Sequence, residues 1–169
     1  MSAALKRLAP WVLSALAVVA AVIFFLLWQQ ERSDARAREE MAARAESFVV
    51  ALTNFSAETI EDDAARIKSF AVGDFAQEAD AFFGDQAVAA IEEAQAVSEG
   101  DIESLFVQEL EGESGSVFAV VSETVMNSER AEPQTDTLRL EVGMIKTSSG
   151  WKVNRVEILQ SSGTVLPSG

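Results

Sequence analysis

Hydrophobic positions along the chain follow three successive patterns: one unbroken apolar run, then helical spacing, then alternation. The unbroken run occupies residues 11–28, reads WVLSALAVVAAVIFFLLW and contains no charged residue. Its 18 residues, at about 1.5 Å each, span roughly 27 Å, which is close to the thickness of a bilayer's hydrocarbon core. We therefore predict a transmembrane helix over residues 11–28, with Trp11 and Trp28 as its anchors at the two membrane interfaces.

Positive charge flanks the apolar run on its N-terminal side. Lys6 and Arg7 precede the run, and the first acidic residue is Glu31. The positive-inside rule then places residues 1–10 in the cytoplasm and the C-terminal part outside the plasma membrane. The alternative is a cleaved signal peptide, whose apolar region is about 7–15 residues long and ends at a small-x-small site. The longer run here ends in Leu-Leu-Trp-Gln-Gln, which favours an uncleaved anchor.

Helical spacing continues beyond the apolar run without a glycine or a proline. Residues 29–40 are polar on every side, which predicts a helical stalk. From there to residue 55, apolar residues recur every three or four positions and predict a buried helix face. The residues of this stripe are Met41, Ala45, Phe48, Leu52 and Phe55.

Capping signals predict two shorter helices next. Thr59 begins the first, as half of a capping box with Asp62 three residues on. Gly73 is placed to end this helix, and Asp74 then caps the second. Spaced apolar residues around Ile91 add a further turn or two.

After residue 100 the apolar positions alternate, which is the period of a half-buried strand. We predict four strands, over residues 102–110, 116–126, 138–146 and 151–159. In the last strand the apolar parity changes after Val153, which predicts a bulge or a bend near Asn154. Trp151 begins that strand and is expected to be buried against the helices.

Helices followed by a run of antiparallel strands predict an α+β fold, with the helices on one face of the sheet. We expect one extracytoplasmic domain, over residues 41–160. Residues 161–169 are polar and are expected to form a disordered tail.

Composition excludes several classes of function. Against 13 Lys and Arg stand 27 Asp and Glu, so the formal charge of −14 disfavours binding to nucleic acid phosphates. The chain has no His, Cys or Tyr, which removes thiol nucleophiles, thiolate or imidazole zinc sites and a Ser-His-Asp triad. We therefore expect no catalytic residues, no bound metal and no cofactor.

Two stretches carry a resemblance to a known family. Residues 52–83 read LTNFSAETIEDDAARIKSFAVGDFAQEADAFF, and residues 138–159 read LRLEVGMIKTSSGWKVNRVEIL. Together with the apolar run, they resemble the actinobacterial Mce-associated membrane proteins. This resemblance implies a nuclear-transport-factor-2-like, or cystatin-like, cone: helices packed on a curved antiparallel sheet. Secretion-system assembly proteins share the GWKV hairpin at residues 150–153 and the same anchor-plus-cone layout.

What the resemblance implies about function is a non-catalytic accessory subunit of a Mce-type complex that takes up sterols or fatty acids through the cell envelope. Its partners would be the membrane and the Mce transporter subunits. Two alternatives stay open. The chain could be a scaffold of another envelope complex, such as a secretion system, or a cone domain that itself binds an apolar lipid.

Two sets of residues are candidate binding surfaces. Residues 58–113 contain sixteen acids and only two bases, Arg66 and Lys68, which predicts either a docking face for a basic partner or solvated helix surfaces. The candidate acidic face consists of Glu61, Asp62, Asp63, Glu78 and Asp80. Large aromatic side chains could line a lipid-sized cavity or simply fill the core. These side chains are Phe48, Phe70, Phe82, Phe106 and Phe118.

Overall fold

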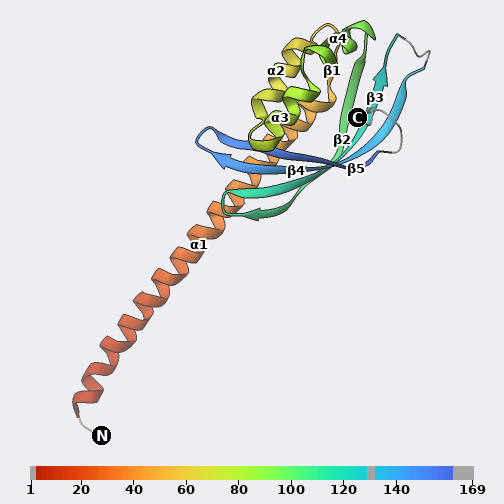
Figure 1. Cartoon of the computed structure of the whole chain (residues 1–169). Coiled ribbons are helices and arrows are strands. Elements are labelled where there is room, and N and C mark those ends of the chain that lie inside the picture. The colour runs from red at the N-terminus through yellow and green to blue at the C-terminus, as the bar shows by residue number, and fades with distance from the viewer. Residues whose placement is uncertain (1–2, 129–131, 162–169) are drawn as a thin grey trace. The chain divides into compact units, whose positions relative to one another are not determined.

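The structure is a computed structural model that describes residues 3–128 and 132–161 (Figure 1). Within its helices and strands, side chains are described from Ala21 onward, apart from Leu26, Leu27, Gln160 and Ser161. The chain divides into two units, residues 1–39 and residues 40–169. The tail expected at residues 161–169 lies outside the described residues apart from Ser161, which ends the last strand.

Helix α1 runs without a break through Ala3–Thr53, and its backbone includes both the predicted membrane span and the predicted stalk. Most side chains of the span at residues 11–28, Trp11 among them, lie outside the described residues. Among the residues that are described, no helix is both long enough and apolar enough to cross a membrane. The described apolar side chains just before Trp28 are exposed, and the guanidinium of Arg32 lies 3.8 Å from the centre of the Trp28 ring.

The second unit is built on a five-stranded antiparallel sheet whose strands follow chain order (Figure 1). The strands are β1 (Phe55–Ser56), β2 (Val97–Glu111), β3 (Ser114–Met126), β4 (Gln134–Thr147) and β5 (Gly150–Ser161). Four of them are the predicted strands, each longer than expected, because cross-strand hydrogen bonds continue where the apolar alternation fades. The short strand β1 was not predicted; it pairs Phe55 with Ser98.

Extra residues in two strands account for the curvature of the sheet. Strand β2 has register shifts against β3 after Ile102 and after Val107. Strand β5 has a shift where Gly143 pairs with Arg155 and Met144 pairs with Val153, so Asn154 is the extra residue. Because a bulge bends its strand and increases the local twist, these shifts curve the sheet around one face. The bulge predicted near Asn154 is confirmed.

Three short helices follow α1: α2 (Ile60–Phe70), α3 (Gly73–Phe82) and α4 (Asp85–Glu93). The capping box predicted for α2 is wrong, because the Thr59 hydroxyl donates to the Asp63 carboxylate (2.7 Å) and makes no capping hydrogen bond to the backbone. Gly73 does not end α2 but begins α3, and Asp74 lies inside α3 after the N-cap residue Val72.

Helix α2 ends early because its next two residues join the sheet. Ala71 forms a parallel bridge with Val153, and the Val72 N–H donates to the Val153 carbonyl (2.8 Å). This pairing draws the backbone into an extended form at Ala71, so the helix stops at Phe70. Gly73, at φ +58°, then turns the chain into α3.

The hydrophobic core lies between the concave face of the sheet and the helices. Phe48 of α1 is fully buried at its centre, with its ring centroid 5.7 Å from that of Phe70 in α2 and 5.5 Å from that of Phe75 in α3. Both ring pairs are edge-to-face, the arrangement that aromatic quadrupoles favour. Of the predicted α1 stripe, Met41, Ala45 and Phe48 are buried, whereas Leu52 and Phe55 are half-buried.

Replacing Trp151, which is 3% exposed as expected, tests the core. Trp151→Ala removes a buried aromatic side chain, so we expect the free energy of unfolding to fall by about 3–5 kcal/mol in urea titrations. Phe82→Ala is the matched control, because Phe82 is 63% exposed in α3 and its loss leaves no cavity. Equal unfolding midpoints for the two variants would contradict the packing of β5 against the helices.

Candidate functional site

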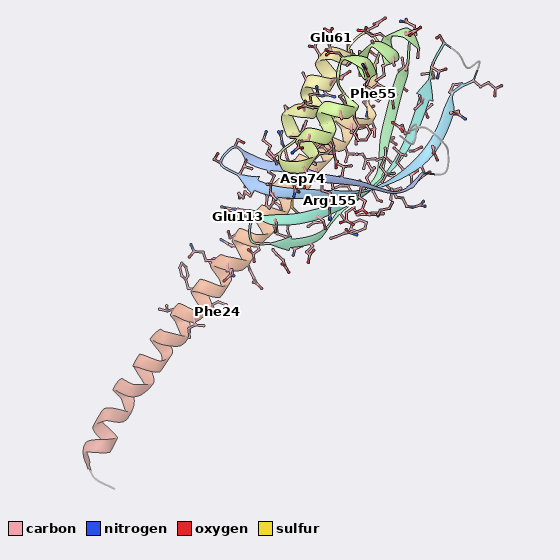
Figure 2. All side chains as sticks on the ribbon, viewed as in Figure 1. Phe24, Phe55, Glu61, Asp74, Glu113 and Arg155 are labelled. Carbon is pink, nitrogen blue, oxygen red and sulfur yellow. The ribbon has the colours of Figure 1, made fainter. Side chains whose placement is uncertain are left out.

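An acidic hollow of about 380 Å³ lies where the β2–β3 hairpin end meets β4, β5 and α3. Figure 2 shows Asp74 and Arg155, which both border it, close together at this end of the unit. Five carboxylate side chains line the hollow, from three different elements. They are Asp74 and Glu78 of α3, Glu109 and Glu111 of β2, and Glu141 of β4.

Arg155 is the one basic residue among the side chains that line the acidic hollow. Its Nη2 donates to Glu141 Oε1 at 3.1 Å, which offsets one of the five negative charges. Asn154, the bulged residue, also lines the hollow, and its Oδ1 is buried and accepts no hydrogen bond in the described structure. The acidic hollow therefore offers negative charge, which suits a basic ligand.

The candidate acidic face predicted from the sequence is divided between two helices. Glu61, Asp62 and Asp63 occupy the first turn of α2, where carboxylates stabilise the helix dipole. Figure 2 places Glu61 at the far end of the helix layer from Asp74. Of the remaining two, Glu78 lines the acidic hollow, whereas Asp80 forms an ion pair with Lys68 at 3.3 Å.

The five candidate phenylalanines also lie in different places. Phe48 and Phe70 belong to the core, and Phe70 additionally borders a second, open hollow of about 520 Å³ between α1 and α2. Phe106 and Phe118 face each other across β2 and β3 with ring centroids 5.2 Å apart, and Phe106 is 50% exposed. Phe82 is exposed on α3, and neither hollow includes Phe82, Phe106 or Phe118.

A second polar site joins the C-terminal end of α1 to strand β2; we call it the α1–β2 junction and define it by Thr53, Asn54, Ser98 and Gly100. The Asn54 side chain pairs with Gly100 as a strand would, donating from Nδ2 to Gly100 O (3.1 Å) and accepting at Oδ1 from Gly100 N–H (3.2 Å). The Ser98 hydroxyl lies 2.9 Å from the Thr53 carbonyl oxygen, and both residues are buried.

Two buried carboxyl groups adjoin the α1–β2 junction. Glu123 of β3 pairs in register with Gly100 on one side and with Asp136 of β4 on the other, and it is only 8% exposed. Its Oε1 lies 2.7 Å from the Ser98 hydroxyl. Burial raises the pKa of Glu123 above 4.5; the hydrogen bond from Ser98 opposes that rise, and the Asp136 carboxyl adds to it.

Sequence reasoning missed both polar groupings, and for different reasons. Glu123 occupies a core-face position of the strand predicted at residues 116–126, so the pattern indicates one buried carboxyl. Asp136 has the parity of the core face too, but it lies two residues before the strand predicted at 138–146. The acidic hollow had no such signal, because its residues come together only through the curvature of the sheet. Among the described residues, no group of three or more carboxylates is arranged to hold a metal ion.

The architecture of residues 40–161 defines the class of protein: helices packed on a curved, half-barrel antiparallel sheet. An IcmL-like type IV secretion system protein from Legionella pneumophila shares this fold, with a TM-score of 0.60, 14% identity, and coverage of 78% of this chain and 96% of that one. VirB8 of Agrobacterium tumefaciens matches with a TM-score of 0.60 at 12% identity, covering 76% and 94%. The periplasmic domain of DotI matches with a TM-score of 0.58 at 12% identity, covering 69% and 91%.

The chain belongs to the family described as "Uncharacterized protein Rv1363c/MT1408-like", whose profile matches residues 3–160. A relative from Mycobacterium tuberculosis H37Rv, "Uncharacterized protein Rv1363c", is 23% identical over 158 residues. That match covers 87% of this chain and spans 60% of the length of the relative. The solved structures confirm the expected fold of helices on a curved antiparallel sheet. The family and the mycobacterial relative are described without any mention of a Mce transporter, so the expected Mce association is not shown.

Substitution of Gly100 tests the α1–β2 junction. A Cβ atom at Gly100 would overlap the side chain of Thr53, so Gly100→Ala forces the end of α1 off the strand. We expect this overpacking to lower the free energy of unfolding by about 1–3 kcal/mol, measured by urea titration. In the double variant Gly100→Ala/Thr53→Gly, position 100 carries the side chain and position 53 has none, so the overlap is relieved. This variant should recover part of the lost free energy of unfolding. Strictly additive effects in this double-mutant cycle would contradict the close approach.

Proposed function

We propose that this protein is a non-catalytic scaffold subunit of an envelope complex, in which the acidic hollow docks a basic segment of another subunit. The observation that carries the proposal is the convergence of five carboxylates with one paired arginine on a single hollow. A surface of one sign attracts a partner of the opposite sign and orients it during encounter. Two of the proteins of similar fold named above support such a role by their descriptions, one as a type IV secretion system protein and the other as a periplasmic domain.

Membrane attachment belongs to the same proposal. We propose that residues 11–28 of α1 cross the plasma membrane, with residues 1–10 in the cytoplasm and the sheet domain outside. The exposed side chains of Val22, Ile23, Phe24, Phe25 and Trp28 support it, because large exposed apolar patches mark contact with a membrane or a partner. The guanidinium of Arg32 over the Trp28 ring fits an interface position, where an aromatic side chain and a cation meet the headgroups.

Association with a Mce-type lipid transporter stays a prediction that rests on the family resemblance alone. Lipid binding inside the cone likewise stays a prediction. Neither prediction conflicts with a scaffold role. The basic segment that docks in the acidic hollow could, for example, belong to a transporter subunit.

Position-specific cross-linking tests the docking proposal directly, because the chain has no native cysteine. Glu111→Cys places a single thiol in the acidic hollow of the full-length protein. In envelope membranes of cells that express it, a thiol-to-amine cross-linker should join this position to a specific protein with an exposed Lys-rich segment. Raising the salt concentration should reduce the yield severalfold, because the attraction is screened.

The matched control is Glu61→Cys, which carries the same substitution on the first turn of α2. Adding Glu78→Gln and Glu109→Gln to the Glu111→Cys chain should abolish most of the cross-link, whereas Glu58→Gln and Asp62→Asn in the same chain should not. If both positions yield the same products, or if the two charge-neutralised chains behave alike, the acidic hollow is not the docking site.

Labelling from outside tests the proposed topology. A membrane-impermeant maleimide should label Glu111→Cys in intact spheroplasts and should label Ser2→Cys only after lysis. The asymmetry follows from Lys6 and Arg7, which hold the N-terminal side in the cytoplasm. Labelling of Ser2→Cys in intact spheroplasts would contradict this orientation, and a shortened, released product would show that the span is cleaved.

A further inference from the structure

The hydrogen bonds at the α1–β2 junction do not balance if Glu123 is ionised. The Ser98 oxygen lies 2.7 Å from Glu123 Oε1 and 2.9 Å from the Thr53 carbonyl oxygen. A hydroxyl carries one proton and donates one full hydrogen bond, whereas a carboxylate and a carbonyl can only accept. With an ionised Glu123, one of these two short contacts therefore brings two acceptors together without a proton.

The contacts balance when Glu123 carries a proton. Its O–H then donates to the Ser98 oxygen, and the Ser98 hydroxyl donates to the Thr53 carbonyl. That carbonyl belongs to the last residue of α1, where helical carbonyls lack a partner within the helix. The Glu123 carboxyl, the Ser98 hydroxyl and the Thr53 carbonyl all belong to buried residues, with Thr53 at 1% and Ser98 at 2% exposure. A hydrogen bond left unmade among these groups therefore costs more free energy than one at the surface.

The charge environment favours the same protonated form. From β4, Asp136 faces Glu123 across the pair, and like charges directly opposite on adjacent strands repel. The Thr137 N–H donates to one oxygen of the Asp136 carboxyl, Oδ1, at 2.7 Å. From α1 and β2, the described groups that face Glu123 are the uncharged Thr53, Ser98 and Gly100.

We propose that Glu123 makes the attachment of α1 to the sheet depend on pH: the protonated carboxyl completes the chain through Ser98 to Thr53, whereas an ionised carboxylate takes the Ser98 hydroxyl proton and leaves the Thr53 carbonyl without a donor. The proposal is independent of the acidic hollow and of the partner proposed above. The direction of the pH dependence follows from the linkage between proton binding and folding. Because burial raises the pKa of Glu123 above 4.5 in the folded chain, the contribution of this group to stability is complete below pH 4.5. That contribution is lost as the pH rises through the raised value.

Hydrogen exchange on the full-length protein tests the proposal, with protection factors corrected for the intrinsic pH dependence of exchange. From below pH 4.5 to neutrality, protection in residues 53–57 and 97–100 should fall by up to tenfold per pH unit. Residues 142–146 of β4 serve as the internal reference and should change less. In Glu123→Gln the amide donates to Ser98 but cannot lose a proton, so protection at the α1–β2 junction should be independent of pH.

Two further variants separate the junction from general charge effects. Glu99→Gln removes one exposed negative charge from β2 and should keep the pH dependence of the parent chain. Ser98→Ala removes the middle of the chain, so protection in residues 53–57 should be low at every pH. The proposal is wrong if Glu123→Gln retains the parent's pH dependence, if Glu99→Gln abolishes it, or if Ser98→Ala leaves residues 53–57 pH-dependent.

Discussion

The close approach of one helix segment to the sheet, at two glycines, is the constraint on which the rest of this domain depends. At one end of the segment the Met41 side chain occupies the space where Gly115 would carry a Cβ, and at the other end Thr53 does the same at Gly100. With both ends of the segment held this close, Phe48 reaches the centre of the concave face. Helices α2 and α3 then pack their own phenylalanines against it, so the helix layer depends on these two contacts.

The alternation of apolar residues was enough to predict the four long strands and the bulge. The change of parity after Val153 placed an extra residue at Asn154, and the register of β4 and β5 shows it there. Helix boundaries were less predictable, because tertiary hydrogen bonds decide them. Gly73 has a helix-ending residue type, yet α2 stops three residues earlier, where Ala71 and Val72 pair with Val153. Neither the residue types nor the spacing of apolar positions around Ala71 and Val72 indicates that pairing.

For the polar sites too, the sequence pattern predicts which way a residue faces, whereas the packing of distant elements decides which residues meet. The parity of β3 and β4 puts Glu123 and Asp136 on the core face, but only Glu123 lies within a strand that the pattern predicts. That they lie opposite each other, and beside Ser98, depends on the register of three strands. The acidic hollow depends on still longer-range geometry, since α3, β2 and β4 contribute its carboxylates from positions that extend from Asp74 to Glu141. Its charge could be predicted from composition, but not its location.

The shortness of strand β1 affects whether copies of this chain can pair with one another. Strand β1 covers β2 only at Val97 and Ser98, so in the described structure most of the outer edge of β2 has no strand beside it. Open edges of this kind invite pairing with another copy of the same chain and, from there, aggregation. Here the edge carries Asp101, Glu103, Glu109 and Glu111, and two bulges interrupt it. Two such edges repel each other and fit poorly, so β2 can stay uncovered at high local concentration without seeding sheet growth between copies.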